Sequence, residues 1–150
     1  MGQECDERED GAPPTDRAAS IAPAGAPPRR AGIGPDVMLL SPTGGAHTES
    51  LARALSGEGC VVSVAADVVD EDEHTSLGRI DVVLIDIDAG QQHGLDLVRA
   101  VRRLADVPIV VVSATNDELD AVLALELGAD DFVARPVRTR ELVARIRAVL

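Results

Sequence analysis

The chain has 150 residues, a length typical of one domain, and carries a formal net charge of −12 at pH 7. Because the phosphates of nucleic acids would repel so acidic a chain, we expect that it does not itself bind nucleic acid. No apolar run has the length of a membrane span, and the N-terminus lacks the basic and apolar regions of a secretory signal. Cys5 and Cys60 have no metal-ligand spacing, so the sequence predicts a protein of the reducing cytoplasm without a membrane partner.

Residues 1–35 differ in composition from the rest of the chain. They contain six of the nine prolines and many alanines and glycines, and Ile21 and Ile33 are their only branched aliphatic residues. Such a segment cannot bury enough apolar surface to offset the entropy that ordering would remove. We therefore predict a disordered arm at residues 1–35 and one folded domain at residues 36–150.

From residue 36 onward, short apolar runs alternate with stretches that have helical spacing. The predicted strands cover residues 37–40, 60–64, 82–85, 107–112 and 131–134. The predicted helices cover residues 48–56, residues 95–104, a segment from a capping box at 115–118 to a stop at Gly128, and the end of the chain with Thr139 as cap. This alternation predicts an α/β domain, a doubly wound five-stranded parallel sheet with helices on both faces.

Polar residues stand at the ends of three predicted strands. Asp86 follows one apolar run, Ser113 follows the next, and Arg135 follows the last. In such sheets ligands bind at the carboxyl ends of the strands, close to the switch in strand order. A carboxylate, a hydroxyl group and a cation at this edge are the groups that a phosphoryl-accepting aspartate needs.

These residues and their spacing resemble the receiver domain of two-component response regulators, specifically its OmpR/PhoB-like subfamily, over residues 36–150. The matching segments are Asp86 with Gly94 and Leu95, Ser113-Ala114, the run at 128–132 and the run at 141–147. The resemblance implies the CheY-like strand order 2-1-3-4-5 and a signalling role rather than an enzymatic one, with no catalytic residue. It makes Asp86 the phosphoacceptor position, Asp88, Ser113 and Arg135 its neighbours, and Ser113 and Phe132 the switch residues.

The site departs from the family pattern at three positions. Typical receivers have two acids after the first strand that bind Mg²⁺, whereas this chain has Ser41 and Pro42 there. The usual lysine is Arg135, whose planar fork does not simply replace a compact ammonium group. Because Mg²⁺ prefers hard oxygen ligands, we expect at most weak Mg²⁺ binding and no resident cofactor. We also expect weak or absent phosphorylation of Asp86, with Arg135 clamping that acid directly.

Two alternatives involve Asp88. In the first, Asp86 and Asp88 rebuild a metal site and the receiver is phosphorylated. In the second, Asp86-Ile87-Asp88 is the Asp-x-Asp motif of a haloacid-dehalogenase-like phosphohydrolase, with Asp86 as nucleophile and Asp88 as general acid. The acidic pair Asp130-Asp131 precedes Arg135, which is the wrong order for that class, and residues 36–80 have no role in it.

The resemblance also implies a symmetric dimer through the fourth helix, fifth strand and fifth helix. The residues expected on this face are Glu126, Asp130, Asp131, Arg145 and Arg147. Two charge pairs are retained, Glu126 with Arg147 and Asp131 with Arg145, while the usual basic partner of Asp130 falls at Ala121. Exposed pairs contribute only ~0–1 kcal/mol each, so they direct the geometry more than the strength.

We therefore expect an atypical receiver that acts in signal transduction and transcription regulation as a homodimer. A sensor histidine kinase or a small-molecule ligand would supply its input. DNA binding would come only from a winged-helix effector domain, which in such regulators follows the receiver and lies beyond Leu150 of this chain.

Overall fold

The computed structural model describes residues 34–67, 79–89 and 93–150. Nearly all of the predicted arm at residues 1–35 lies outside these ranges, so the arm and the domain boundary remain predictions. Within the described ranges the elements in chain order are β1 (Asp36–Leu40), α1 (Ala46–Gly57), β2 (Val61–Ala65), β3 (Val82–Ile87), α3 (His93–Leu104), β4 (Ile109–Ser113), α4 (Glu118–Glu126), β5 (Asp131–Ala134) and α5 (Thr139–Val149).

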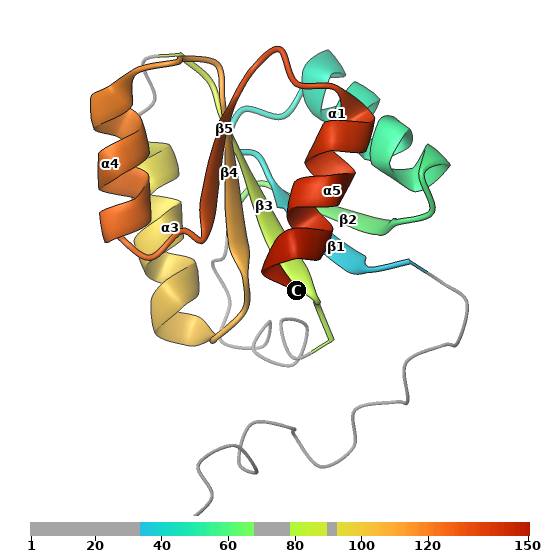
Figure 1. The fold of residues 1–150 in the computed structure, drawn as a ribbon, viewed down its shortest axis with the longest axis horizontal. Coiled ribbons are helices and arrows are strands. Elements are labelled where there is room, and N and C mark those ends of the chain that lie inside the picture. Colours follow the sequence, from blue (N-terminus) through green and yellow to red (C-terminus); the bar gives the residue numbers. More distant parts are fainter. Residues whose placement is uncertain (1–33, 68–78, 90–92) are drawn as a thin grey trace, which may run out of the picture.

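The five strands form one parallel sheet in the order β2-β1-β3-β4-β5, which confirms the predicted topology (Figure 1). The order reverses between β1 and β3, where such folds hold their ligands. The register aligns Ile87 at the end of β3 with Ser113 of β4, and Ser113 with Ala134 of β5. The polar residues that end these strands therefore meet at one edge of the sheet.

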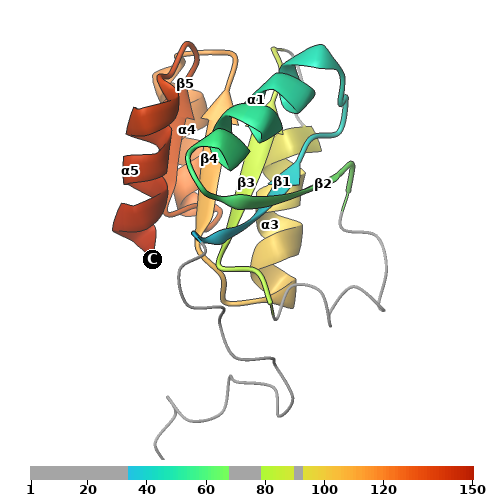
Figure 2. The ribbon, with the colours of Figure 1, turned by 90° about the vertical axis from the view of Figure 1, so that its right-hand side faces the viewer.

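Each face of the sheet is covered by helices because its central strands, β3 and β4, are apolar and buried on both sides. Helices α3 and α4 lie on one face, and α1 and α5 lie on the other (Figure 1). Figure 2 shows α1 in front of the sheet and α3 behind it. Alternate residues of β3 point to opposite faces, so Val83 and Ile85 pack toward α3 while Val82 and Leu84 pack toward α1 and α5. Burial of each such side chain stabilises the fold by roughly 1.5–3 kcal/mol.

Two predicted helix caps are wrong. Asp117, not Thr115, is the N-cap of α4, and its Oδ1 accepts the Leu119 backbone N–H at 2.8 Å. The Thr115 hydroxyl group donates instead to the side chain of Asp120. At α5 the cap position is Arg138, without a side-chain cap, and Thr139 is the first helical residue. A capping pattern in the sequence does not show which of several neighbouring oxygens will reach the backbone.

Helix α4 buries little of its apolar surface. Ala124 is its buried residue, while Leu119 is 63% exposed and Leu125 47% exposed. Val122 and Leu123 are also exposed. An apolar surface of this kind is typical of a face that another molecule covers.

In the described part of the chain, no helix combines the length and the apolar character needed to cross a bilayer.

Candidate functional site

Asp86 is a buried acid on the α1 side of the sheet, at the end of β3 and only 3% exposed. It points to this side because it follows Val82 and Leu84 in the alternation of the strand. Burial raises the pKa of the Asp86 carboxyl above its ordinary value. The nearby charges of Arg135 and His47 act in the opposite direction and lower this pKa, but by less than burial raises it.

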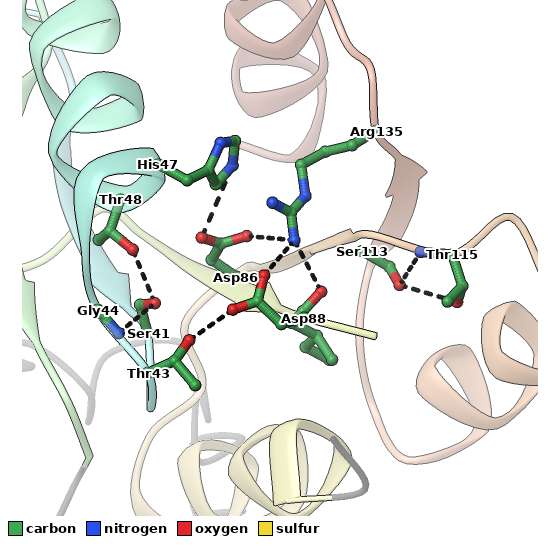
Figure 3. Close-up of polar contacts among 11 residues, drawn as sticks. Ser41, Thr43, Gly44, His47, Thr48, Asp86, Asp88, Ser113, Thr115 and Arg135 are labelled. Atoms are coloured by element: carbon green, nitrogen blue, oxygen red, sulfur yellow. Dashed lines mark hydrogen bonds and ion pairs between the residues drawn. The ribbon is translucent and has the colours of Figure 1, made fainter. Parts of the chain in front are cut away.

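Arg135 lies over the end of β3, although it follows β5, because its long side chain crosses the end of β4. Its Nη2 atom donates to the Ile87 carbonyl oxygen at 3.0 Å and to Asp88 Oδ1 at 2.8 Å. The same nitrogen lies 3.4 Å from Asp86 Oδ1 (Figure 3). One guanidinium nitrogen therefore faces two carboxylates and a carbonyl group. The expected approach of Arg135 to Asp86 is present, and Asp88 receives the shorter contact.

Two buried polar atoms in this cluster have no hydrogen-bond partner, Asp86 Oδ1 and Arg135 Nε. The 3.4 Å contact between Asp86 and Arg135 is within ion-pair range, but it does not have the geometry of a hydrogen bond. The attraction between these side chains is therefore mainly one of charge. The peptide bond between Arg135 and Pro136 is cis.

Both side-chain oxygens of Asp88 are already engaged within the protein. Oδ1 accepts from Arg135, and Oδ2 accepts from the Thr43 hydroxyl group at 2.6 Å. The hydrogen bonds from Arg135 and then from Thr43 lower the pKa of the Asp88 carboxyl. Asp88 is thus held as a carboxylate by a cation and a hydroxyl group of its own chain.

Neutral side chains follow β1, where the family pattern has acids. Ser41 Oγ lies 2.9 Å from Thr48 Oγ1, and both residues are buried. Ser41 Oγ also accepts the Gly44 backbone N–H at 3.3 Å (Figure 3). Within residues 34–67, 79–89 and 93–150, no three His, Cys, Asp or Glu side chains are grouped so that they could hold a metal ion.

His47 is a site residue that the sequence reasoning missed. Its Nε2 atom lies 3.8 Å from Asp86 Oδ2, and its side chain is 47% exposed. His47 belongs to the first turn of α1, which begins directly beyond the end of β1. Its position two residues after Gly45, at the start of the helix that follows β1, was the signal that could have found it.

Ser113 lies in the site, but its hydroxyl group is directed elsewhere. It is 3% exposed, and its Oγ atom lies 3.2 Å from Thr115 Oγ1. Figure 3 shows Ser113 paired with Thr115 on the side away from Asp86. Phe132, the other predicted switch residue, is half-buried and packs against the apolar cluster on the α3 and α4 side.

The predicted dimer-face residues are partly engaged within one protomer. Asp131 Oδ2 lies 3.1 Å from Arg145 Nη1, and Arg145 also contacts Glu141. Asp130 Oδ2 accepts from Arg102 Nη2 at 3.0 Å and from the Ile109 backbone N–H at 2.8 Å. Glu126 and Arg147, the other two predicted residues, are exposed.

The family can be assigned from the sequence match. The model of the response regulator receiver domain matches residues 45–147. The chain therefore belongs to the response regulator receiver domains, which are signalling domains, and the predicted resemblance is confirmed.

The relatives are OmpR/PhoB-family regulators of bacteria. The chain is 39% identical to the transcriptional regulatory protein CpxR of Escherichia coli over 109 residues, which are 69% of this chain and 44% of CpxR. It is 39% identical to the sensory transduction protein RegX3 of Mycolicibacterium smegmatis over 102 residues, which are 68% of this chain and 45% of RegX3. The chain thus spans less than half the length of these relatives.

Solved structures agree with the fold. The receiver domain of the TMAO respiratory system response regulator TorR superimposes with a TM-score of 0.63 and 32% identity, over 77% of this chain and 95% of that one. A response regulator from Thermotoga maritima gives a TM-score of 0.61 and 26% identity, over 78% of this chain and 98% of that one.

Proposed function

We propose that this chain is an atypical receiver domain that signals with little or no Mg²⁺-dependent phosphorylation of Asp86. The observation that carries the proposal is the position of Arg135 Nη2, which contacts Asp88 at 2.8 Å, the Ile87 carbonyl at 3.0 Å and Asp86 at 3.4 Å. A cation belonging to the chain thus lies among the oxygen atoms that a metal ion would need.

The residues at the end of β1 support the same proposal. A carboxylate accepts a phosphoryl group only when the added negative charge is neutralised, and Mg²⁺ does this through hard oxygen ligands. Pro42 offers no side-chain ligand, and Ser41 is a neutral one whose oxygen already accepts from Gly44. The donor set fits a magnesium ion poorly, so the activity proposed here requires no metal.

Asp88 does not favour the alternative of a rebuilt metal site. Each of its side-chain oxygens accepts a hydrogen bond, one from Arg135 and one from Thr43. A metal ion at this acid would have to displace a cation that is part of the chain. The phosphohydrolase alternative is left without support, because the family match runs through residues 45–147 and includes both acids of its motif.

The output of the proposed receiver is a homodimer through α4, β5 and α5. The exposed apolar residues of α4 supply its contact area, led by Leu119 and Leu125. The acidic residues of α4 and the basic residues of α5 give this face both signs of charge, as a two-fold interface requires. Asp130 pairs with Arg102 of its own chain, and its usual basic partner falls at Ala121, so we expect no interprotomer charge pair at Asp130.

The input and the target are proposed from the family. Receiver domains of two-component systems take their signal from a sensor histidine kinase, and this remains one candidate for the chain. A small-molecule ligand is the second candidate, because phosphorylation is expected to be weak. The name of CpxR, a transcriptional regulatory protein, supports a role in transcription regulation that would depend on an effector domain beyond the receiver.

Phosphorylation in vitro tests the proposal. We expect that incubation with acetyl phosphate and Mg²⁺ leaves the intact mass unchanged, because the acid pair after β1 is missing and Arg135 lies beside Asp86. The matched variant carries Ser41→Asp, Pro42→Asp and Arg135→Lys together, and it should gain one phosphoryl group, which Asp86→Asn in the same background should abolish. A stoichiometric phosphoryl group on Asp86 of the unmodified chain would overturn the proposal.

A further inference from the structure

A series of hydrogen bonds joins the buried end of β4 to the first turn of α4. Thr115 Oγ1 donates to Asp120 Oδ2 at 2.9 Å, and Ser113 Oγ lies 3.2 Å from Thr115 Oγ1. A hydroxyl group has one hydrogen to donate. Because Thr115 gives its hydrogen to Asp120, Ser113 must be the donor in the bond between the two hydroxyl groups. The series therefore has one direction, from Ser113 through Thr115 to Asp120.

This direction removes the Ser113 hydrogen from the site. The Thr115 backbone N–H also donates to Ser113 Oγ at 3.1 Å, so the hydroxyl oxygen is held from two sides. Ser113 is only 3% exposed, and solvent has little access to compete for it. The last acceptor is a carboxylate, and hydrogen bonds to ionised groups are the stronger ones. Ser113 cannot donate toward Asp86 while Thr115 and Asp120 hold it.

The opposite end of the series is connected to the Arg135 cluster through the backbone. The Arg135 N–H donates to the Ser113 carbonyl at 2.7 Å, and the Ala114 N–H donates to the Ile87 carbonyl at 2.8 Å. The Ile87 carbonyl is also an acceptor for Arg135 Nη2. A shift of the guanidinium group would therefore act on the two residues that precede Thr115.

We infer that Asp120 is a positioning residue that holds the Ser113 hydroxyl group through Thr115 and couples α4 to the charge cluster around Asp86. Helix α4 is suited to respond, because Ala124 is its buried residue and its larger apolar residues, Leu119, Val122, Leu123 and Leu125, are exposed. The inference rests on the proposed function only for the consequence of this coupling, which is a change in the dimer face. The hydrogen-bond series itself does not depend on dimerisation.

Hydrogen exchange of the α4 amides in the full chain tests the coupling. Thr115→Val and Asp120→Ala should each accelerate exchange across residues 118–126 by about tenfold, the effect expected for loss of one hydrogen bond to a charged group. Glu118→Ala is the matched control, because it removes an exposed acid from the same turn and should leave exchange unchanged. The conservative changes Thr115→Ser and Asp120→Asn retain a donor and an acceptor, and they should restore slow exchange.

A second substitution separates coupling from simple support of the helix. Asp86→Asn should alter α4 exchange in the otherwise unmodified chain and have no further effect in the Thr115→Val background. Equal effects of Asp86→Asn in both backgrounds would overturn the inference. So would unchanged exchange in Thr115→Val.

Sedimentation equilibrium of the same proteins separates this inference from the proposed function. A chain that stays monomeric contradicts the proposed dimer, while the exchange data still decide whether the coupling exists. A dimer whose α4 exchange is indifferent to Thr115 supports the proposed function and refutes the coupling.

Discussion

At the scale of single residues, Asp86 and Asp88 are two neighbouring acids with opposite surroundings. Burial is the main influence on Asp86 and raises its pKa, whereas hydrogen bonds from Arg135 and Thr43 lower the pKa of Asp88. The folded state therefore binds a proton more tightly than the unfolded state at Asp86, and less tightly at Asp88. By linkage, the contributions of the two acids to the free energy of unfolding change with pH in opposite directions.

The pH dependence of unfolding should reveal this opposition. The charged form of Asp86 destabilises the fold above its raised pKa, and this penalty disappears as the pH falls below the ordinary value of 3.8. Asp86→Asn should therefore unfold at higher denaturant concentration than the parent at pH 7, with the difference shrinking toward pH 4. Urea titrations monitored by circular dichroism at several pH values measure this difference.

Asp88→Asn is the matched control, because it makes the same chemical change two residues away. The stabilisation from the Asp88 carboxylate is present above the ordinary pKa and is lost as the pH falls through the lowered one. The variant should therefore be less stable than the parent at pH 7. If both variants were more stable than the parent at pH 7, or both less stable, the opposite directions of the two pKa shifts would be contradicted.

The cluster itself was only partly predictable. The polar strand ends predicted that Asp86, Ser113 and Arg135 would meet, because parallel strands end at one edge of a sheet. Thr43 and His47 were not predicted as site residues. Thr43 lies in the loop after β1 and His47 at the start of α1, and the path of this segment depends on tertiary packing. The direction of the Ser113 hydroxyl group could not be predicted either, because it depends on the side chain of Thr115.

At the scale of elements, α4 combines a small buried contact with a large apolar surface. Its spacing of apolar residues is that of a helix with an apolar face, but Leu119, Val122 and Leu123 of that face are exposed in the single chain. The periodicity of a helix shows that such a face exists, yet it does not show whether the chain itself or another molecule covers it. The strands were easier to predict, because runs such as 82–85 are apolar on both faces and match the centre of a covered parallel sheet.

Substitution of Leu119 should weaken the dimer without harming the fold. Leu119 is 63% exposed, so Leu119→Ser removes little buried surface from the single chain but removes contact area from the proposed interface. We expect a dimer dissociation constant about tenfold higher, within the range for loss of one apolar interface side chain. Sedimentation equilibrium gives the constant, and thermal unfolding checks the fold.

Val64→Ser provides the control for this change. Val64 is 54% exposed and lies on β2, at the opposite edge of the sheet from β5. It should leave the dissociation constant unchanged. An equal effect of both substitutions would argue against α4 as the interface.

At the scale of the whole molecule, Arg102 joins parts of the chain that are distant in sequence. From α3 it donates to the Val107 carbonyl at 2.9 Å and, through Nη2, to the Gly128 carbonyl at 2.6 Å. It also pairs with Asp130 at 3.0 Å. The α3 helix, the entry to β4 and the turn before β5 are thus held by one side chain. Gly128 has φ of +118°, and a Cβ atom there would lie 3.1 Å from Arg102, so the turn requires glycine.

Loss of Arg102 should destabilise the domain. Arg102→Ala would remove the side-chain donor of the Val107 and Gly128 carbonyl groups and the ion pair of Asp130, at roughly 1–3 kcal/mol for groups that stay unsatisfied. The neighbouring change Arg103→Ala is the control, because Arg103 is exposed in the same helical turn. Urea denaturation of both variants compares the free energies of unfolding. A similar loss in each would show that a general effect of removing an arginine from α3, and not the joining contacts, is responsible.

The guanidinium group of Arg135 beside Asp86 has one more consequence. A phosphoryl group on a receiver has a lifetime, and its hydrolysis ends the signal. An arginine that neutralises the same acid is a permanent part of the chain, so its effect does not end by hydrolysis. If the proposed function holds, dimer formation follows mass action and depends on how much of the protein is made. Expression, together with any ligand that shifts the dimer equilibrium, would then control the strength and the duration of the response, in place of chemical turnover at the strand end.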